Sequence, residues 1–306
     1  MSIPKRRLGA TGMTVSEIGF AGDALAVAPA VNDPEPVVHA ALDAGIDLFE
    51  AVPYGDGDGE AILARALRGE HRDLILAARC VAEDHPVWGP DPRTWRPEAV
   101  RRRMEQSLRR LGRDWLDVWL LDNPTEEAID DEDLWASLVQ DRNQGWIRAI
   151  GIVSYGDGPV EVFDEETEER TLAAPPELRP AIAGSAPVDA VSVRFGLNET
   201  RLGRFLAAQE AVRDGRVALL ARDPLAGVDD SGPADRLVGD FVFPAMDRTR
   251  EMAALAGVLS VEPLTSALIN PATPAAAREQ AGASAVPLTP AERAELVGRW
   301  DELEQA

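Results

Sequence analysis

Eight short apolar or β-branched runs alternate with helical patterns along the 306-residue chain, and this alternation is the strongest constraint on its fold. Apolar runs of this length suit strands that are buried on both faces. The predicted strands occupy residues 16–21, 47–52, 74–80, 117–123, 149–154, 189–196, 217–223 and 266–271. Strand–helix alternation repeated eight times predicts a (β/α)₈ TIM barrel of class α/β, and a doubly wound open sheet is the alternative.

The pattern indicates one domain, residues 1–306, with a short N-terminal β-hairpin before the first strand. Residues 155–187 depart from the pattern, because they form a long acidic and proline-rich connection. This insertion is predicted to be either a disordered surface segment or a lid. Near the end of the chain, Thr289, Pro290 and Glu292 have the spacing of a capped helix start.

Composition excludes several classes of partner. A net charge of −22 argues against nucleic acid and against anionic membrane surfaces, so a small-molecule substrate is expected. No run of eighteen apolar residues is present, so no membrane span is predicted. Cys80 is the only cysteine, which fits a cytoplasmic location, and the three histidines lack metal-ligand spacing, so no metal is predicted. The oligomeric state does not follow from the sequence.

In TIM barrels the reactive residues sit where the strands end, at the carboxyl side of the barrel. Here the predicted strand ends carry many polar and ionisable groups, among them Glu50, Tyr54, Arg79, Asp122, Asn123, Ser154, Arg222 and Asp223. A barrel needs none of these charges for stability, since burying a charge is costly unless it is paired. One interpretation is an active site. The other is a set of rim salt bridges, for example Glu50 with Arg79 and Asp122 with Arg222.

Several segments resemble the aldo-keto reductases, in that family's order: RRLGATGMTVSEIGFAG, ALDAGIDLFEAVPYGDGDGEAILARAL, LRRLGRDWLDVWLLDNP, GWIRAIGIVSYG and LLARDPLAG. The resemblance covers nearly the whole chain, with residues 155–187 as an apparent insertion. It implies a (β/α)₈ barrel whose bottom is closed by an N-terminal hairpin. Members of this family usually reduce aldehydes or ketones with NADPH, using an aspartate, a tyrosine, a lysine and a histidine at the rim.

The resemblance places that catalytic set on four positions of this chain, and three of the four have changed. The aspartate falls on Glu50 and the lysine on Arg79. The histidine falls on Asp122, while Tyr54 is kept. Each replacement preserves polarity, which favours a re-tooled site over a decayed one.

The positions that hold the cofactor in the family have changed as well. The carboxamide-binding pair falls on Val153 and Ser154, and a glutamine of the same role falls on Ser192. The tyrosine that stacks on nicotinamide falls on Arg222, and the following serine falls on Asp223. A cationic Arg222 would be unfavourable beneath an oxidised nicotinamide ring, and Asp223 would repel a pyrophosphate.

Arg278 is still in a position to meet an adenosine, so the resemblance implies a weakened cofactor site. On this basis no cofactor is favoured, with NADPH or NADH remaining possible.

Three hypotheses follow for function. The favoured one is acid/base chemistry without net redox change, the work of a lyase, isomerase or cyclase acting on a small carbonyl-bearing metabolite. Asp122 or Glu50 would move a proton, Tyr54 would be its partner, and Arg79 and Arg222 would hold an anionic oxygen. The alternatives are an NAD(P)H-dependent aldo-keto reductase with an unusual catalytic set and a non-catalytic small-molecule-binding or regulatory protein.

Overall fold

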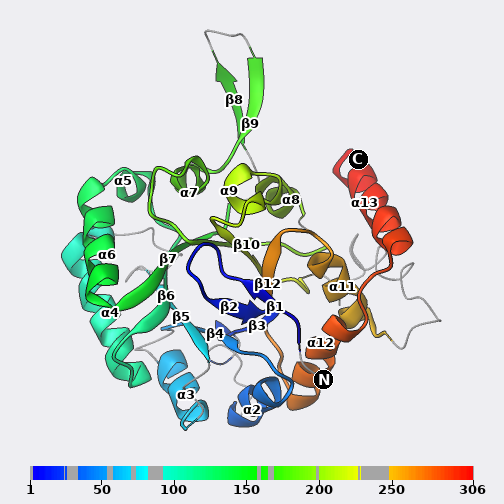
Figure 1. The fold of residues 1–306 in the computed structure, drawn as a ribbon, viewed down its shortest axis with the longest axis horizontal. Coiled ribbons are helices and arrows are strands. Elements are labelled where there is room, and N and C mark those ends of the chain that lie inside the picture. The colour runs from blue at the N-terminus through cyan, green and yellow to red at the C-terminus, as the bar shows by residue number, and fades with distance from the viewer. Residues whose placement is uncertain are drawn as a thin grey trace.

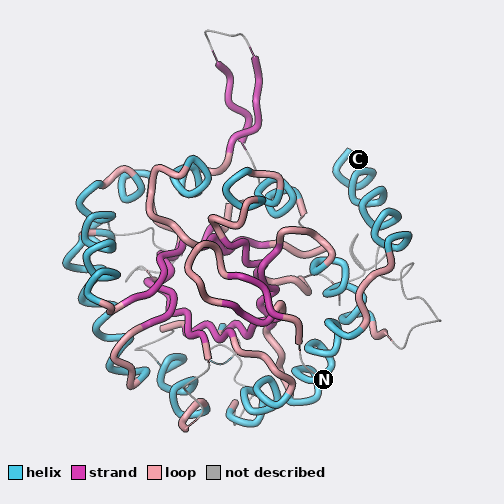
Figure 2. The backbone as a smooth tube through the Cα atoms, viewed as in Figure 1, coloured by secondary structure: helices cyan, strands magenta, loops and turns pink. Residues whose placement is uncertain are grey.

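The computed structural model describes residues 3–23, 25, 34–53, 58–69, 74–81, 92–156, 160–164, 169–197, 200–226, 228 and 248–305. Eight parallel strands close into a barrel, and helices surround it (Figure 1, Figure 2). The barrel strands in chain order are β3 (Ile18–Ala21), β4 (Leu48–Ala51), β5 (Ile75–Cys80), β6 (Leu116–Asp122), β7 (Ile147–Ser154), β10 (Ala190–Arg194), β11 (Ala218–Arg222) and β12 (Leu264–Ile269). The predicted (β/α)₈ barrel is confirmed.

The first and last barrel strands pair with each other, which closes the sheet. In the parallel register of these strands, Phe20 of β3 lies opposite Ile269 of β12 on one side and Phe49 of β4 on the other. An open doubly wound sheet would leave these edges unpaired, so that alternative is excluded.

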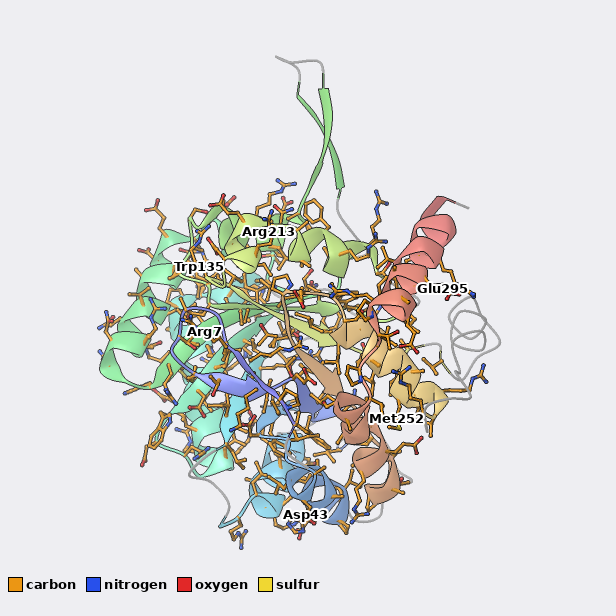
Figure 3. All side chains as sticks on the ribbon, turned by 45° about the vertical axis from the view of Figure 1, so that its right-hand side comes forward. Arg7, Asp43, Trp135, Arg213, Met252 and Glu295 are labelled. Carbon is orange, nitrogen blue, oxygen red and sulfur yellow. The ribbon has the colours of Figure 1, made fainter. Side chains whose placement is uncertain are left out.

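The helices cover the outside of the barrel, as Figure 3 shows for Trp135, Met252 and Glu295 on three of them. The longer helices are α2 (Glu35–Asp43), α3 (Asp58–Ala66), α4 (Pro97–Leu111), α6 (Glu132–Gln144), α11 (Arg250–Leu259), α12 (Pro274–Ala281) and α13 (Pro290–Gln305). The shorter ones are η1 (Pro92–Trp95), α5 (Glu126–Ile129), η2 (Pro176–Leu178), α7 (Arg179–Ala183), α8 (Arg201–Ala207), α9 (Glu210–Arg213) and η3 (Gly282–Ala285). None of the helices in the described ranges is both long enough and apolar enough to cross a membrane.

Local sequence signals set several helix ends. Gly112 and Gly145 end α4 and α6 in the left-handed conformation, with φ of 62° and 82°, which glycine adopts at little cost. The predicted capping box at α13 is confirmed: the Thr289 amide donates to Glu292 Oε2 at 2.6 Å, and the Glu292 amide donates to Thr289 Oγ1 at 3.3 Å.

The N-terminal hairpin consists of β1 (Lys5–Arg7) and β2 (Thr14–Ser16), and it lies across one end of the barrel (Figure 1). Its buried side chains Leu8, Met13 and Val15 belong to the same apolar cluster as the barrel interior. The hairpin therefore closes the amino-terminal end of the barrel, as the family resemblance implied.

The barrel interior is apolar in its middle and charged at its carboxyl end. Side chains alternate between the two faces of a strand, so every second residue points inward. Inward-facing apolar residues on four of the strands are Leu48, Ala77, Leu120 and Leu220. Two residues further along the same strands are Glu50, Arg79, Asp122 and Arg222, all buried. The two-residue period therefore turns these four side chains inward at the carboxyl ends of their strands.

The insertion at residues 155–187 contains a two-stranded antiparallel hairpin, β8 (Val160–Asp164) and β9 (Glu169–Ala173), in which Val162 pairs with Thr171. This hairpin points away from the barrel in both Figure 1 and Figure 3, which differ by a 45° rotation. The lid role of the segment stays a prediction.

Candidate active site

Two arginines and three carboxylates meet at the mouth of the barrel. The arginines are Arg79 at the end of β5 and Arg222 at the end of β11. The carboxylates are Glu50 on β4, Asp122 on β6 and Asp23, which follows β3. We call these five residues the mouth cluster.

Arg79 holds one half of the mouth cluster together. Its Nη1 donates to Asp23 Oδ1 at 2.8 Å, and its Nη2 donates to Asp122 Oδ2 at 2.5 Å. The same Nη2 contacts the phenolic oxygen of Tyr155. Because Arg79 lies opposite Leu120 in the register of β5 and β6, Asp122 sits two residues further along the neighbouring strand and on the same inward face.

Arg222 holds the other half. Its Nη1 donates to both carboxylate oxygens of Glu50, at 2.6 and 2.8 Å, and its Nη2 donates to Asp23 Oδ2 at 2.5 Å. Asp23 thus bridges the two guanidinium groups. The structure pairs Arg79 with Asp122 and Arg222 with Glu50, the reverse of the rim pairs considered from the sequence, because Arg222 reaches across the interior from β11 to β4.

The carboxylate partners keep both buried arginines charged. The side chains of Arg79, Arg222, Glu50 and Asp122 are at most 2% exposed, whereas Asp23 is 20% exposed. Burial alone would lower the pKa of Arg79, but the negative charges of Glu50 and Asp122 outweigh it and raise that pKa well above its ordinary value. The pKa of Arg222 is raised for the same reason, against the same burial, chiefly by Glu50. Neither arginine can act as an acid.

Tyr155 joins the mouth cluster from the end of β7. Its ring lies close to two cations, with the Arg79 guanidinium carbon 5.8 Å and the Arg194 guanidinium carbon 5.7 Å from the ring centroid. Burial raises the pKa of its phenol, although the charge of Arg79 acts in the opposite direction. Tyr155 is therefore a neutral phenol at physiological pH.

A pocket of about 340 Å³ lies beside the mouth cluster, across the carboxyl ends of β10, β11 and β12. It is lined by Arg194, Phe195, Gly196, Asp223, Pro224, Leu225, Ala226, Ile269 and Asn270. Arg194 connects the pocket to the mouth cluster, because it lines the pocket and also faces the ring of Tyr155. The buried Oδ1 of Asn270 has no hydrogen-bond partner among the described residues, so an acceptor faces this region.

The remaining residues predicted for the site occupy different environments. Ser154 is buried and donates to Glu177 Oε1 at 2.6 Å, so its hydroxyl is already engaged. Ser192 is buried in the barrel, where its hydroxyl has no partner within the described part of the chain. Asn123 and Asp223 directly follow β6 and β11 in the left-handed region, with φ of 51° and 48°. Such strain in non-glycine residues is typical of functional loops.

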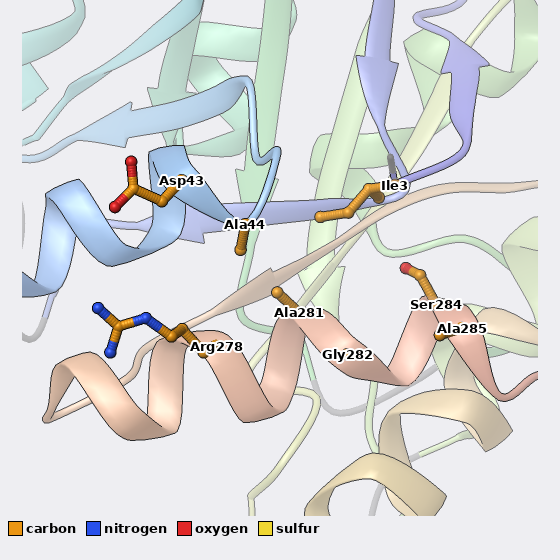
Figure 4. Close-up of a pocket in the computed structure, with 8 residues that line it drawn as sticks. All are labelled: Ile3, Asp43, Ala44, Arg278, Ala281, Gly282, Ser284 and Ala285. Carbon is orange, nitrogen blue, oxygen red and sulfur yellow. The ribbon is translucent and has the colours of Figure 1, made fainter. Parts of the chain in front are cut away.

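Two predicted residues remain, Tyr54 and Arg278. Tyr54 lies outside the described residues. Arg278 lines a second pocket, of about 260 Å³, together with Ile3 and Asp43 (Figure 4). The carboxyl-terminal ends of α2 and α12 form this pocket, so it lies towards the end of the barrel that the N-terminal hairpin closes, away from the mouth. A cofactor role for Arg278 stays a prediction.

Sequence reasoning missed Asp23 as a site residue and did not rank Tyr155 among them. Asp23 follows the first barrel strand in IGFAGD, and Tyr155 follows the fifth in GIVSYG. The strand-end rule that selected Glu50 and Arg79 points to both, so the signal was present. What the sequence does not supply is the bridging of two arginines by one carboxylate.

Comparisons with known proteins bear on what this site does. A family model described as the aldo/keto reductase family matches residues 27–172. A 6-dehydroglucose reductase from Novosphingobium aromaticivorans is 29% identical over 189 residues, which cover 57% of this chain and 59% of that protein. An NADH-specific methylglyoxal reductase from Escherichia coli is 28% identical over 172 residues, covering 47% of this chain and 50% of that protein. These matches support an aldo-keto reductase superfamily member.

The solved structures agree on the fold of this chain. A structure of an aldo-keto reductase from Bacillus halodurans superposes with a TM-score of 0.71 and 21% identity, covering 97% of this chain and 96% of that one. At this identity the likeness concerns the fold alone. The chain aligns with only about half to three fifths of the length of the two reductases above.

The favoured sequence hypothesis, an enzyme without net redox change, is wrong. The relatives carry the names of reductases, so an oxidoreductase is supported and a lyase, isomerase or cyclase is not. The expectation that no cofactor is favoured is wrong too, since one relative is named as NADH-specific. The argument against a cofactor treated Arg222 and Asp223 as unpaired charges, and this was its physical error. Arg222 is neutralised by two carboxylates, and Asp223 Oδ2 lies 3.7 Å from Arg194 Nε.

Proposed function

We propose that this chain is an NAD(P)H-dependent oxidoreductase that interconverts a small carbonyl compound and the corresponding alcohol. The observation that carries the proposal is the pocket at the ends of β10–β12, which opens directly beside the mouth cluster. A nucleotide in that pocket and a substrate at the mouth would meet at the side of Tyr155 and Arg194. This arrangement suits transfer between two bound molecules.

The donor set of the pocket supports a nicotinamide nucleotide. Asn270 supplies a buried acceptor with no partner in the described ranges, which a ribose hydroxyl or an amide would satisfy. Arg194 supplies a half-exposed cation suited to a pyrophosphate. Asp223 offsets part of that charge, so we expect the affinity to depend on salt.

The charge of the mouth cluster supports the same reading. Its three carboxylates exceed its two guanidinium groups by one, so the cluster as a whole is anionic rather than cationic. The net negative charge of the mouth cluster would therefore attract a positively charged, oxidised nicotinamide ring, even though the nearby Arg222 is itself a cation. Bound NAD(P)H supplies the hydride for carbonyl reduction.

The residues of this chain hold the substrate carbonyl and supply its proton. The buried hydrogen bond from Arg79 to Asp122 fixes the position of the Asp122 carboxyl group at the mouth. Glu50 accepts a hydrogen bond from Arg222 and so fixes the position of its guanidinium group at the base of the site. Tyr54, which follows β4 in the sequence, remains a candidate substrate-binding or proton-donating residue. Small polar carbonyl compounds suit such a charged mouth, and the names of the two relatives suggest sugar-derived ketones and dicarbonyls.

The proposal is tested by titrating the protein with NADPH and NADH, followed by the fluorescence of the reduced ring, and then by screening turnover of methylglyoxal and oxidised sugars. We expect a dissociation constant below roughly 1 mM for at least one nucleotide and nucleotide-dependent turnover of at least one carbonyl compound. Absence of binding to both nucleotides at that concentration would refute the proposed function.

A further inference from the structure

A third pocket, of about 380 Å³, lies among the outer helices and is lined by three arginines. They are Arg204 on α8, Arg213 at the end of α9 and Arg293 near the start of α13, so three separate helices bring them to one place. The whole chain carries 31 basic and 53 acidic residues, yet Glu262 is the one carboxylate among the described residues that line this pocket. We call it the arginine pocket, and its lining carries the opposite sign of charge from the chain as a whole.

The sequence around α8 and α9 explains this local excess of positive charge. Residues 201–216 contain four arginines and two acidic residues. The two acidic residues, Glu210 and Asp214, both contact Arg216, at 3.7 and 2.7 Å. Arg216 does not line the arginine pocket, whereas the exposed Arg213 does. The carboxylates of this segment are therefore directed at an arginine outside the pocket.

The two other arginines are placed so that an anion can reach them. The guanidinium carbon of Arg204 lies 5.9 Å from the ring centroid of the buried Trp300, and this cation–π contact helps to fix its position. Arg293 Nη1 lies 3.7 Å from Glu262 Oε1, and the two side chains are 43% and 80% exposed. An exposed pair of this kind contributes little to stability, so a more highly charged anion can displace Glu262 at small cost.

The arginine pocket lies at the closed end of the barrel, away from the mouth cluster. Helix α8 begins beyond the carboxyl end of β10, and its last residues line the pocket. The opposite wall, residues 260–262, leads into the start of β12. Arg6 of the N-terminal hairpin donates to the backbone oxygens of Leu264 and Leu259, on both sides of that wall, at 2.6 and 3.2 Å. An anion bound here would not meet a substrate at the mouth.

We propose that the arginine pocket binds a small polyvalent anion with two linked phosphate groups, either free pyrophosphate or the diphosphate of a nucleotide. Guanidinium groups are planar and permanently charged, and they bind phosphate oxygens through paired hydrogen bonds. Three of them in one pocket offer more donors than a single phosphate needs. The anion would connect α8, α9 and α13, and so stabilise the folded protein. This binding site does not depend on the proposed function.

The test is calorimetric titration of the wild-type protein with inorganic pyrophosphate and, separately, with ADP. We expect a dissociation constant on the order of 10⁻⁴ M at low salt, which weakens as salt is added because the charges are partly exposed. The double variant Arg213→Gln/Arg293→Gln should bind pyrophosphate at least about tenfold more weakly, since two charge-assisted contacts are lost. Arg109→Gln, at an arginine on α4 that is 66% exposed, is the control and should bind within about threefold of the wild type.

The two ligands identify the source of the phosphates. Affinity for ADP more than about tenfold above that for pyrophosphate would assign the site to a nucleotide, and equal affinities would assign it to free pyrophosphate. Equal pyrophosphate affinity in the wild type and the double variant would overturn the inference. Loss of binding in Arg194→Gln but not in the double variant would overturn it as well, because the anion would then lie in the pocket beside the mouth cluster.

Thermal unfolding provides a second readout that requires no turnover. Pyrophosphate at about a hundredfold excess over its dissociation constant should raise the Tm of the wild-type protein by roughly 4 °C. The single variant Arg213→Gln, at an exposed position, should remain folded and show a smaller rise. An equal rise in the wild type and in Arg213→Gln would contradict the site. A protein that fails to bind NADPH and NADH but shows these effects would refute the proposed function and leave this inference in place.

Discussion

Replacing Arg222 by methionine should lower the free energy of unfolding by about 3–5 kcal/mol, because it leaves a buried carboxylate without its partner. Arg222 donates two hydrogen bonds to Glu50, and both side chains are nearly inaccessible to solvent. It also donates to Asp23, which would lose one of its two arginine partners. Chemical denaturation with a two-state fit measures the change.

The control for this prediction is Arg109→Met, which removes an exposed arginine on α4 whose nearest carboxylate is Glu105, 3.9 Å away and one helical turn earlier. Exposed pairs of this kind contribute little, so the loss should stay below about 0.5 kcal/mol. The double variant Arg222→Met/Glu50→Gln should recover most of the stability lost in Arg222→Met, since no unpaired carboxylate remains at that point. Equal losses for Arg222→Met and Arg109→Met would contradict the mouth cluster as described.

Replacing Arg79 by methionine should lower kcat by about 10²–10³-fold, because the buried charge that holds Asp122 and contacts Tyr155 at the mouth is lost. Arg79 contacts Tyr155, Asp122 and Asp23 but does not line the proposed nucleotide pocket. The nucleotide dissociation constant should therefore change by less than about threefold, so that the effect appears in kcat rather than in binding. Steady-state kinetics and nucleotide titration on the folded variant provide both numbers.

Arg79→Lys is the informative companion to Arg79→Met. It keeps the positive charge but loses the planar fork that reaches three partners at once, so its activity should fall between those of the wild type and Arg79→Met. A lysine variant as inactive as the methionine variant would show that the fork geometry, and not the charge, is what matters. Wild-type activity in Arg79→Met would show that neither Arg79 nor its contact with Tyr155 is needed for turnover.

The fold followed from the sequence because strand burial and strand period are local properties. The run 47–52 contains the observed β4, Leu48–Ala51, and the inward position of Glu50 follows from its two-residue spacing to Leu48. The same spacing on other strands placed Arg79 and Asp122 at the mouth. These residues could be predicted because each depends only on its own strand.

The pairing inside the mouth could not be predicted in the same way. Which arginine meets which carboxylate depends on how far the strands are staggered around the closed barrel, and that stagger has no signature in a single strand. Arg222 reaches Glu50 across the interior, and Asp23 bridges both arginines, so charges that look isolated in the sequence are paired in the structure. This difference removed the main physical objection to a nicotinamide cofactor.

The most direct test of the central claim, that this protein transfers a hydride, is to follow deuterium. The wild-type protein is incubated with a carbonyl substrate and nucleotide that carries deuterium at its transferable position, and the product is examined by mass spectrometry and NMR. The account predicts one deuterium on the former carbonyl carbon for each nucleotide oxidised, with a solvent-derived proton on the oxygen. A product that forms without deuterium and without nucleotide oxidation would contradict it.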